Sequence, residues 1–229
     1  MQILVETFNR DRLIESCALF GGEFEDRKRF VYHGTSRAYS RGIEASGLSP
    51  GFQAVDPTIL RELADSLPVV EQSLATTIRT HADHPTRLGF AAYSFAAVDF
   101  ALKSGGQILS LCRKCVSCGA NVPAALQELF DKLSKETGCV YAIELQELPS
   151  GMTFEHGVIQ SAQPVGAQQI RARVDLPSGF GVDDFLTIKG RPPLYHARLE
   201  NGSLSKRLWE RGLGTPEDLW VQAVTNDPD

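Results

Sequence analysis

The chain has 229 residues, 42% of them hydrophobic, with 23 basic and 28 acidic residues and a formal net charge of -5. This length and composition can bury a sizeable hydrophobic core and fit one domain with an appended lobe. The acidic balance does not predict capture of nucleic acid by a broadly basic surface, although a local basic groove is compatible with it.

Hydrophobic periodicity and turn signals predict strands and helices along most of the chain. The helix expected within residues 50–68 has clear signals, because Asp56 can cap it and Pro57 suits its first turn. In chain order, the predicted elements are a strand at 2–5, a helix at 10–19, a short strand at 30–32, helices at 36–47, 50–68 and 69–80, a strand at 90–95, helices at 96–103 and 123–135, and strands at 139–145, 152–158 and 170–176.

One stretch, Val31-Tyr32-His33-Gly34-Thr35-Ser36, ends a predicted strand just before a predicted helix. Tyr39 and Ile43 lie four residues apart on one face of that helix, and Gly47 can end it. We therefore expect His33 at the junction of strand and helix. There, Gly34 would let a substrate approach the backbone, and free amides near the helix start would donate hydrogen bonds.

This arrangement resembles the first signature of the ADP-ribosyltransferase superfamily, in which a strand carrying His-Gly-Thr precedes a helix reading Ile-x-x-x-Gly-Leu. Ile43, Gly47 and Leu48 fill the second half of that signature. The superfamily's second signature is a strand with an aromatic residue, followed by a helix with a closely packed small residue about two turns on. Tyr93 and Ala101 occupy these places, and the two signatures occur in the expected order.

The resemblance covers roughly residues 27–177 and implies an α+β fold with an ADP-ribosyltransferase-like split antiparallel β-sheet core and flanking helices. It implies a catalytic domain at residues 1–177, with a helical insertion at about residues 50–87 that we expect to act as a lid or acceptor platform. Residues 178–229 are expected to form a C-terminal extension packed on the same domain.

The resemblance also implies that NAD+ is a co-substrate. Cleavage of its nicotinamide–ribose bond passes through a sugar cation, so the enzyme must hold both ends of NAD+ and stabilise positive charge. In the family, the strand histidine holds the adenosine-side ribose, the glycine backbone bonds the nicotinamide amide, and an aromatic ring stacks on the nicotinamide. The cofactor-binding residues implied here are His33, Gly34, Thr35, Ser36, Arg37 and Tyr93.

The third family position is usually a glutamate on a later strand, which binds the nicotinamide-side ribose and stabilises the developing cation. Glu155 is the candidate, and the implied catalytic set is therefore His33, Tyr93 and Glu155. Gln160 and Glu144 are the fallback candidates for the glutamate's place.

Two arginines, Arg37 and Arg41, lie four residues apart on the helix expected after His33. A guanidinium offers forked donors to phosphate oxygens, so either side chain could contact the pyrophosphate of NAD+. Solvated helix arginines are the commoner case, and Ser36 has an equally plain role as a helix cap.

The resemblance therefore implies a mono-ADP-ribosyltransferase, a glycosyltransferase that cleaves NAD+, releases nicotinamide and transfers ADP-ribose to a protein, nucleic acid or small molecule. A bacterial toxin or effector role is an expectation from the superfamily. Two alternatives stay open: an NAD+ glycohydrolase that sends water to the ribose, and a non-catalytic module of the same fold that binds a nucleotide or a protein. An RNA 2′-phosphotransferase would require a set of further arginines that we do not find.

The chain has five cysteines, an odd number in a chain too long to need disulfides, so reduced thiols are expected. Three of them form the pattern Cys112-x-x-Cys115-x-x-Cys118, and Cys139 would complete a tetrahedral zinc site. The pattern lacks a second cysteine pair. We therefore favour a loop of free thiols over zinc, and we expect no metal in the catalytic site.

Residues 1–20 lack the features of a cleaved secretory signal, and no apolar run approaches membrane-spanning length. We therefore expect no membrane partner. The expected location is the cytoplasm, or a host cell into which the protein is delivered without a cleaved signal peptide.

Overall fold

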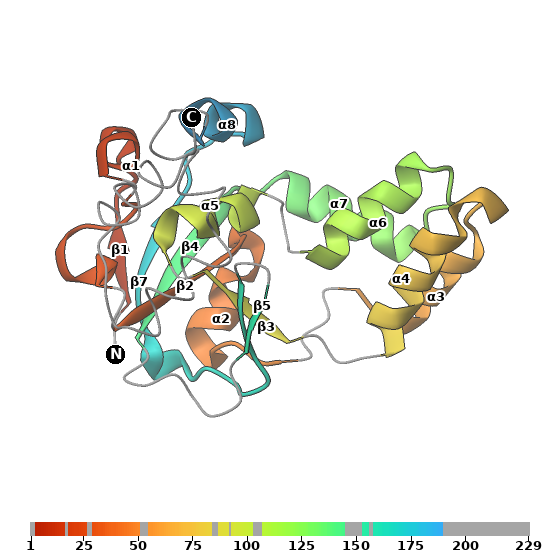
Figure 1. Ribbon diagram of the computed structural model, residues 1–229, viewed down its shortest axis with the longest axis horizontal. Coiled ribbons are helices and arrows are strands. Elements are labelled where there is room, and N and C mark those ends of the chain that lie inside the picture. The colour runs from red at the N-terminus through yellow and green to blue at the C-terminus, as the bar shows by residue number, and fades with distance from the viewer. Residues whose placement is uncertain are drawn as a thin grey trace, which may run out of the picture.

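The computed structural model describes residues 3–16, 18–26, 29–50, 55–83, 87–91, 93–102, 107–144, 153–155 and 158–189. In these residues, strands and helices form an α+β body with two β-sheets, and further helices form a lobe to one side of the body (Figure 1).

The larger sheet has four strands in the order β1-β7-β4-β2. Only its β1–β7 pair is parallel, so the sheet is mixed. The expectation of a fully antiparallel sheet is therefore wrong. Parallel neighbours need a long crossover connection, and here most of the described chain lies between the two strands. The four strands are β1 (Leu4–Glu6), β7 (Ile170–Asp175), β4 (Gly138–Glu144) and β2 (Phe30–Ser36).

The smaller sheet is antiparallel and has the order β3-β6-β5, with β3 (Leu88–Phe90), β6 (Val158–Ser161) and β5 (Thr153–Glu155). The single strand predicted over residues 152–158 is wrong, because Glu155 of β5 pairs with Val158 of β6. The two sheets are joined by a backbone bridge between Tyr32 and Ala91, whose N–H to O distances are 3.0 and 2.8 Å.

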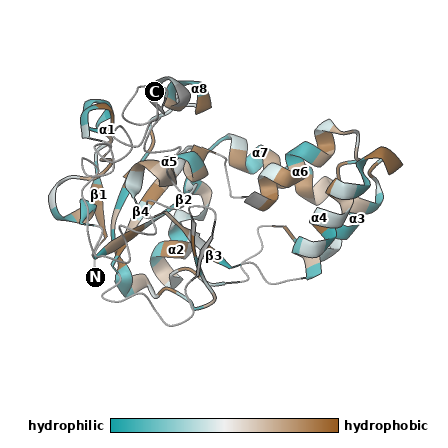
Figure 2. Ribbon diagram, in the orientation of Figure 1, coloured by the Kyte–Doolittle hydropathy of each residue, from teal (hydrophilic) through white to brown (hydrophobic). Residues whose placement is uncertain are grey.

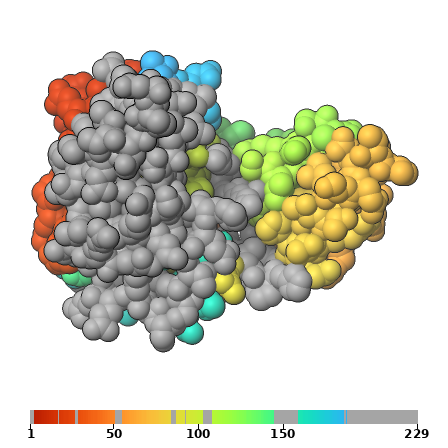
Figure 3. Space-filling model, in the orientation of Figure 1, coloured from red at the N-terminus to blue at the C-terminus, as the bar shows by residue number. Residues whose placement is uncertain are grey.

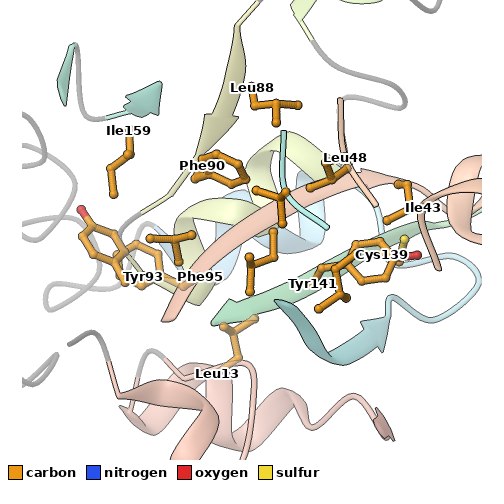
Figure 4. Packing of buried hydrophobic residues seen from close by; sticks show 14 residues of the cluster. Leu13, Ile43, Leu48, Leu88, Phe90, Tyr93, Phe95, Cys139, Tyr141 and Ile159 are labelled. Carbon is orange, nitrogen blue, oxygen red and sulfur yellow. The ribbon is translucent and has the colours of Figure 1, made fainter. Parts of the chain in front are cut away.

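Helices cover both faces of the four-stranded sheet. One face packs against α5 (Ser94–Leu102) and α8 (Val182–Lys189), which contribute Val98 and Phe185 to its buried cluster. The other face packs against α2 (Ser40–Ser46) through Ile43 and against α1 (Arg10–Ser16) through Leu13 (Figure 4). The remainder of the expected C-terminal extension, residues 190–229, lies outside the described residues.

Two glycines let α5 pack directly on the strand backbones. A Cβ built on Gly34 of β2 would lie 1.9 Å from the carbonyl oxygen of Ala97 and 2.7 Å from the nitrogen of Ala101. A Cβ on Gly138 of β4 would lie 2.7 Å from the carbonyl oxygen of Ala101. The close packing predicted for Ala101 is therefore present.

The helical lobe is built from two separate segments of the chain. Helix α3 begins as predicted, since the Asp56 carboxylate accepts a 2.7 Å hydrogen bond from the Thr58 amide and Pro57 opens the first turn. The helices share one buried cluster, and they carry hydrophobic and hydrophilic residues as amphipathic helices do (Figure 2). The lobe consists of α3 (Pro57–Asp65), α4 (Gln72–Asp83), α6 (Gln107–Ser117) and α7 (Ala124–Ser134).

The lobe thus extends beyond the insertion expected at about residues 50–87, because α6 and α7 complete its core. Its residues, coloured gold to green in Figure 3, form one end of the molecule. None of the helices in the described part of the chain combines the length and the apolar character needed to cross a bilayer.

Candidate functional site

His33 lies in the middle of β2, where it pairs with Tyr141 of β4. The expectation that it ends the strand is wrong, because β2 continues to Ser36 and pairs with β4 along its whole length. The helical turn begins only at Arg37, where Ser36 caps it by accepting a 3.3 Å hydrogen bond from the Ala38 amide.

The His33 ring is fixed by two contacts with β3. Its Nδ1 lies 2.9 Å from the Gly89 carbonyl oxygen, and its ring meets Phe90 edge-on with centroids 5.9 Å apart. A carbonyl oxygen only accepts hydrogen bonds, so the proton lies on Nδ1 and Nε2 is the acceptor of a neutral ring. Burial lowers the pKa of His33, which the bond to Gly89 only partly opposes. His33 is therefore a neutral hydrogen-bond acceptor at pH 7.

The space beside Gly34 is filled by α5 and not by a substrate. The backbone of Ala97 occupies the place of a side chain at Gly34, so the missing Cβ serves helix packing. On the face of the sheet toward α5, therefore, the expectation that a substrate approaches the backbone at Gly34 is wrong.

The residues after Gly34 are spread between core and surface. Thr35 is buried, whereas Arg37 is half-exposed with its Nε 3.7 Å from an Asp175 carboxylate oxygen. Arg41 lies on α2 and is exposed. Helix α2 ends where predicted, at Gly47, whose φ of +82° is a conformation that favours glycine.

Tyr93 immediately precedes α5, and its carbonyl oxygen accepts the first-turn hydrogen bond from the Ala96 amide at 3.2 Å. Tyr93 as a whole is 1% exposed, and its ring stacks on Phe95 with centroids 4.4 Å apart and 24° between the planes. Figure 4 shows the two rings side by side, near Ile159 of β6. One face of the Tyr93 ring is thus taken by Phe95.

The candidates for the glutamate position differ in their surroundings. Glu155 is the last residue of β5 and pairs with Val158, and its side chain lies outside the described residues. Gln160 of β6 pairs with Gly89, the residue that holds the His33 ring. Glu144 is engaged elsewhere, because its two carboxylate oxygens lie 2.7 Å from Arg29 and 2.7 Å from Arg171.

Sequence patterns did not indicate a network of charged residues beneath α2. Arg173 of β7 is 11% exposed at its side chain and pairs with Glu44 of α2 and with Asp175, the latter through Nε to Oδ1 at 2.8 Å. Tyr141 donates to Glu44 at 3.4 Å, and burial raises its pKa. Because His33, Tyr141 and Arg173 are register partners across β2, β4 and β7, this network lies on the same sheet face as His33.

A second network that the sequence did not indicate lies next to Tyr93. Glu25 accepts hydrogen bonds from the Phe20 amide at 2.7 Å and from the Ser94 hydroxyl at 2.6 Å. The Ser94 oxygen in turn accepts from the Leu19 amide at 2.9 Å. Burial raises the pKa of Glu25 to about 7, against the opposing effect of these hydrogen bonds.

Glu25→Gln is expected to gain stability relative to the wild type as the pH rises. The pKa of Glu25 in the folded chain, about 7, lies above the ordinary value of 4.5, so the stabilising contribution of its proton is complete below pH 4.5 and is lost as the pH rises through 7. The difference in unfolding free energy between variant and wild type should increase by about 2 kcal/mol from pH 5 to pH 8. Urea unfolding at the two pH values measures it. Glu23→Gln, in the same turn, is the control and should show no such increase.

Two of the three closely spaced cysteines, Cys112 and Cys115, lie on a helix and not in the loop that we expected. Cys112 and Cys115 of α6 are buried in the core of the lobe, whereas Cys118, just beyond the helix, is partly exposed. Burial raises the pKa of Cys112 to about 12 and that of Cys115 to about 11, so both are neutral thiols. Within the described residues, no three or more His, Cys, Asp or Glu side chains are arranged to hold a metal ion.

We expect iodoacetamide to modify Cys118 at least about tenfold faster than Cys112 or Cys115 in the folded protein, since alkylation requires an accessible thiolate. Peptide mass spectrometry after short exposures gives the three rates. Adding a strong chelator should leave them unchanged. Faster labelling of Cys112 and Cys115 with the chelator would instead indicate metal-bound thiolates.

The elements that carry His33, Tyr93 and Gln160 meet where the two sheets join. His33 follows Tyr32 of the bridge, Tyr93 lies two residues after Ala91, and Gln160 pairs with the residue that holds His33.

Comparison of the chain with models of protein families, with curated proteins and with solved structures gives no match.

Proposed function

We propose that the chain is an NAD+-dependent mono-ADP-ribosyltransferase that uses His33, Tyr93 and Glu155. The observation that carries the proposal is the bridge between Tyr32 and Ala91, which brings together the segments of both signature motifs although they are far apart in sequence. The strand that carries Glu155 belongs to the same small sheet as β3.

The state of His33 supports its assignment to a ribose hydroxyl. The hydrogen bond from Nδ1 to Gly89 fixes the ring and leaves Nε2 as an acceptor. A neutral imidazole accepts a hydrogen bond from a hydroxyl group, whereas an imidazolium cannot, and the lowered pKa of His33 favours the neutral form. Histidine in this state suits a sugar better than a phosphate.

The proposed reaction breaks the bond between the nicotinamide nitrogen and C1′ of the ribose. Nicotinamide leaves as a neutral molecule with the bonding electron pair, and the acceptor's nucleophilic atom forms the new bond to C1′ as its proton is released to water. The carboxylate of Glu155 stabilises the positive charge that develops on the ribose. Water in place of the acceptor would give a glycohydrolase.

The proposal is tested by nicotinamide release from NAD+ and by transfer of labelled ADP-ribose to candidate acceptors. His33→Asn retains a donor for the Gly89 carbonyl but lacks the acceptor Nε2, so we expect the Kd for NAD+ to rise about tenfold. His81→Asn in the helical lobe is the matched control and should bind NAD+ as the wild type does. Release of nicotinamide without transfer to any acceptor would favour the glycohydrolase, and the absence of NAD+ binding would contradict the proposal.

A further inference from the structure

Residues 18–26 contact the sequence neighbours of both proposed site residues. The Tyr32 hydroxyl, next to His33 in the chain, donates to the Phe24 carbonyl at 2.8 Å. The Ser94 hydroxyl, next to Tyr93, donates to Glu25 at 2.6 Å. One short segment therefore supports β2 and α5 at the two places where the site residues lie.

We propose that Glu25 is a positioning residue, which fixes the first turn of α5 and thereby sets the place of the Tyr93 ring relative to His33. Its importance for catalysis rests on the proposed function, whereas its effect on the Tyr93 ring does not.

The hydrogen-bond geometry explains why a carboxylate suits this position. Ser94 is 0% exposed, and its hydroxyl accepts from the Leu19 amide, so its own proton needs an acceptor. Glu25 supplies that acceptor and also satisfies the Phe20 amide. Since Tyr93 is joined to Ser94 by one peptide bond, a shift of the Ser94 side chain moves the start of α5 and, with it, Tyr93 just before the helix.

Ionisation of Glu25 changes the strength of this anchor. A carboxylate accepts hydrogen bonds more strongly than a neutral carboxyl group does, so the bonds to Ser94 and Phe20 tighten as Glu25 loses its proton. The titratable group that faces Glu25 from β2 is Tyr32. On the same segment, the Gly21 amide donates to Glu6 at 2.8 Å, and Glu6 pairs with Arg12 at 3.2 Å. Because the pKa of Glu25 is raised to about 7, the anchor should change near neutral pH.

The test uses the full chain labelled with 13C-tyrosine and free of NAD+, with Tyr93→Phe to identify the Tyr93 ring signals. In the wild type these signals should shift with a midpoint near pH 7, and in Glu25→Gln this shift should be absent. Glu23→Gln, from the same turn and 65% exposed at its side chain, is the control and should titrate as the wild type does. Tyr93 signals that titrate identically in wild type and Glu25→Gln would overturn the positioning role.

Kinetics then show whether the position matters for NAD+. We expect Glu25→Ala to raise the KM for NAD+ about tenfold and Glu25→Gln, which keeps an acceptor, to restore most of that loss at pH 6. An unchanged KM in both variants of an active enzyme would contradict the role in catalysis. If the wild type does not bind NAD+ but the Tyr93 signals respond to Glu25, the proposed function fails while the positioning of Tyr93 stands.

Discussion

Gly34→Ala is expected to destabilise the protein by about 3 kcal/mol or more, which is large for the addition of one methyl group. The new Cβ would lie 1.9 Å from the carbonyl oxygen of Ala97, which belongs to the backbone of α5 and cannot rotate away as a side chain does. Helix α5 would have to move away from β2. That movement would also disturb Ala101, whose nitrogen lies 2.7 Å from the same Cβ position.

Gly42→Ala on α2 is the matched control. A Cβ on Gly42 meets nothing within 4 Å, so alanine there should stabilise the helix by about 0.5–1 kcal/mol. Urea unfolding, or the soluble yield if Gly34→Ala does not fold, measures the contrast. Equal stability of the two variants would mean that α5 does not pack on β2 as described.

Glu155→Gln is expected to lower the kcat of nicotinamide release by about 100-fold or more while the KM for NAD+ changes little. A glutamine can still bond a ribose hydroxyl in the ground state, so NAD+ binding should survive. It lacks the negative charge that stabilises the ribose cation, and this charge contributes mainly in the transition state. Steady-state kinetics with NAD+ separate the two effects.

Glu144→Gln is the control for that experiment, because Glu144 is held by ion pairs at 2.7 Å with Arg29 and Arg171. Its kcat should stay within about twofold of the wild type, since glutamine keeps the size of the side chain and ion pairs to arginines that are 44% and 41% exposed contribute little to the free energy of the folded chain. A large loss of kcat in Glu144→Gln together with normal turnover in Glu155→Gln would contradict the assignment of Glu155.

Elements with local signals could be predicted from the sequence. The start of α3 follows from Asp56 and Pro57, and the end of α2 follows from Gly47, because capping and a positive φ depend on a few neighbouring residues. The extent of β2 could not be predicted in this way, because pairing with β4 carries the strand past His33 to Ser36. Long-range pairing thus overrode the local signal for a helix start.

The supporting networks were not predictable for the same reason. Glu25 and Ser94 are 69 residues apart, and Glu44 and Arg173 are 129 residues apart, so no local pattern links either pair.

For the cysteines of α6, a local pattern was present but predicted the wrong structure. Their regular spacing suggested a loop of thiols or a metal site, whereas Cys112 and Cys115 lie one helical turn apart and fill the core of the lobe.

Calorimetric titration of NAD+ into the wild-type chain, with His33→Asn alongside it, tests most directly whether the junction of the two sheets binds NAD+. We predict saturable binding to the wild type at micromolar to low millimolar NAD+ and about tenfold weaker binding to His33→Asn. A wild-type protein that is folded but shows no binding at millimolar NAD+, or a His33→Asn variant that binds equally well, would contradict the claim.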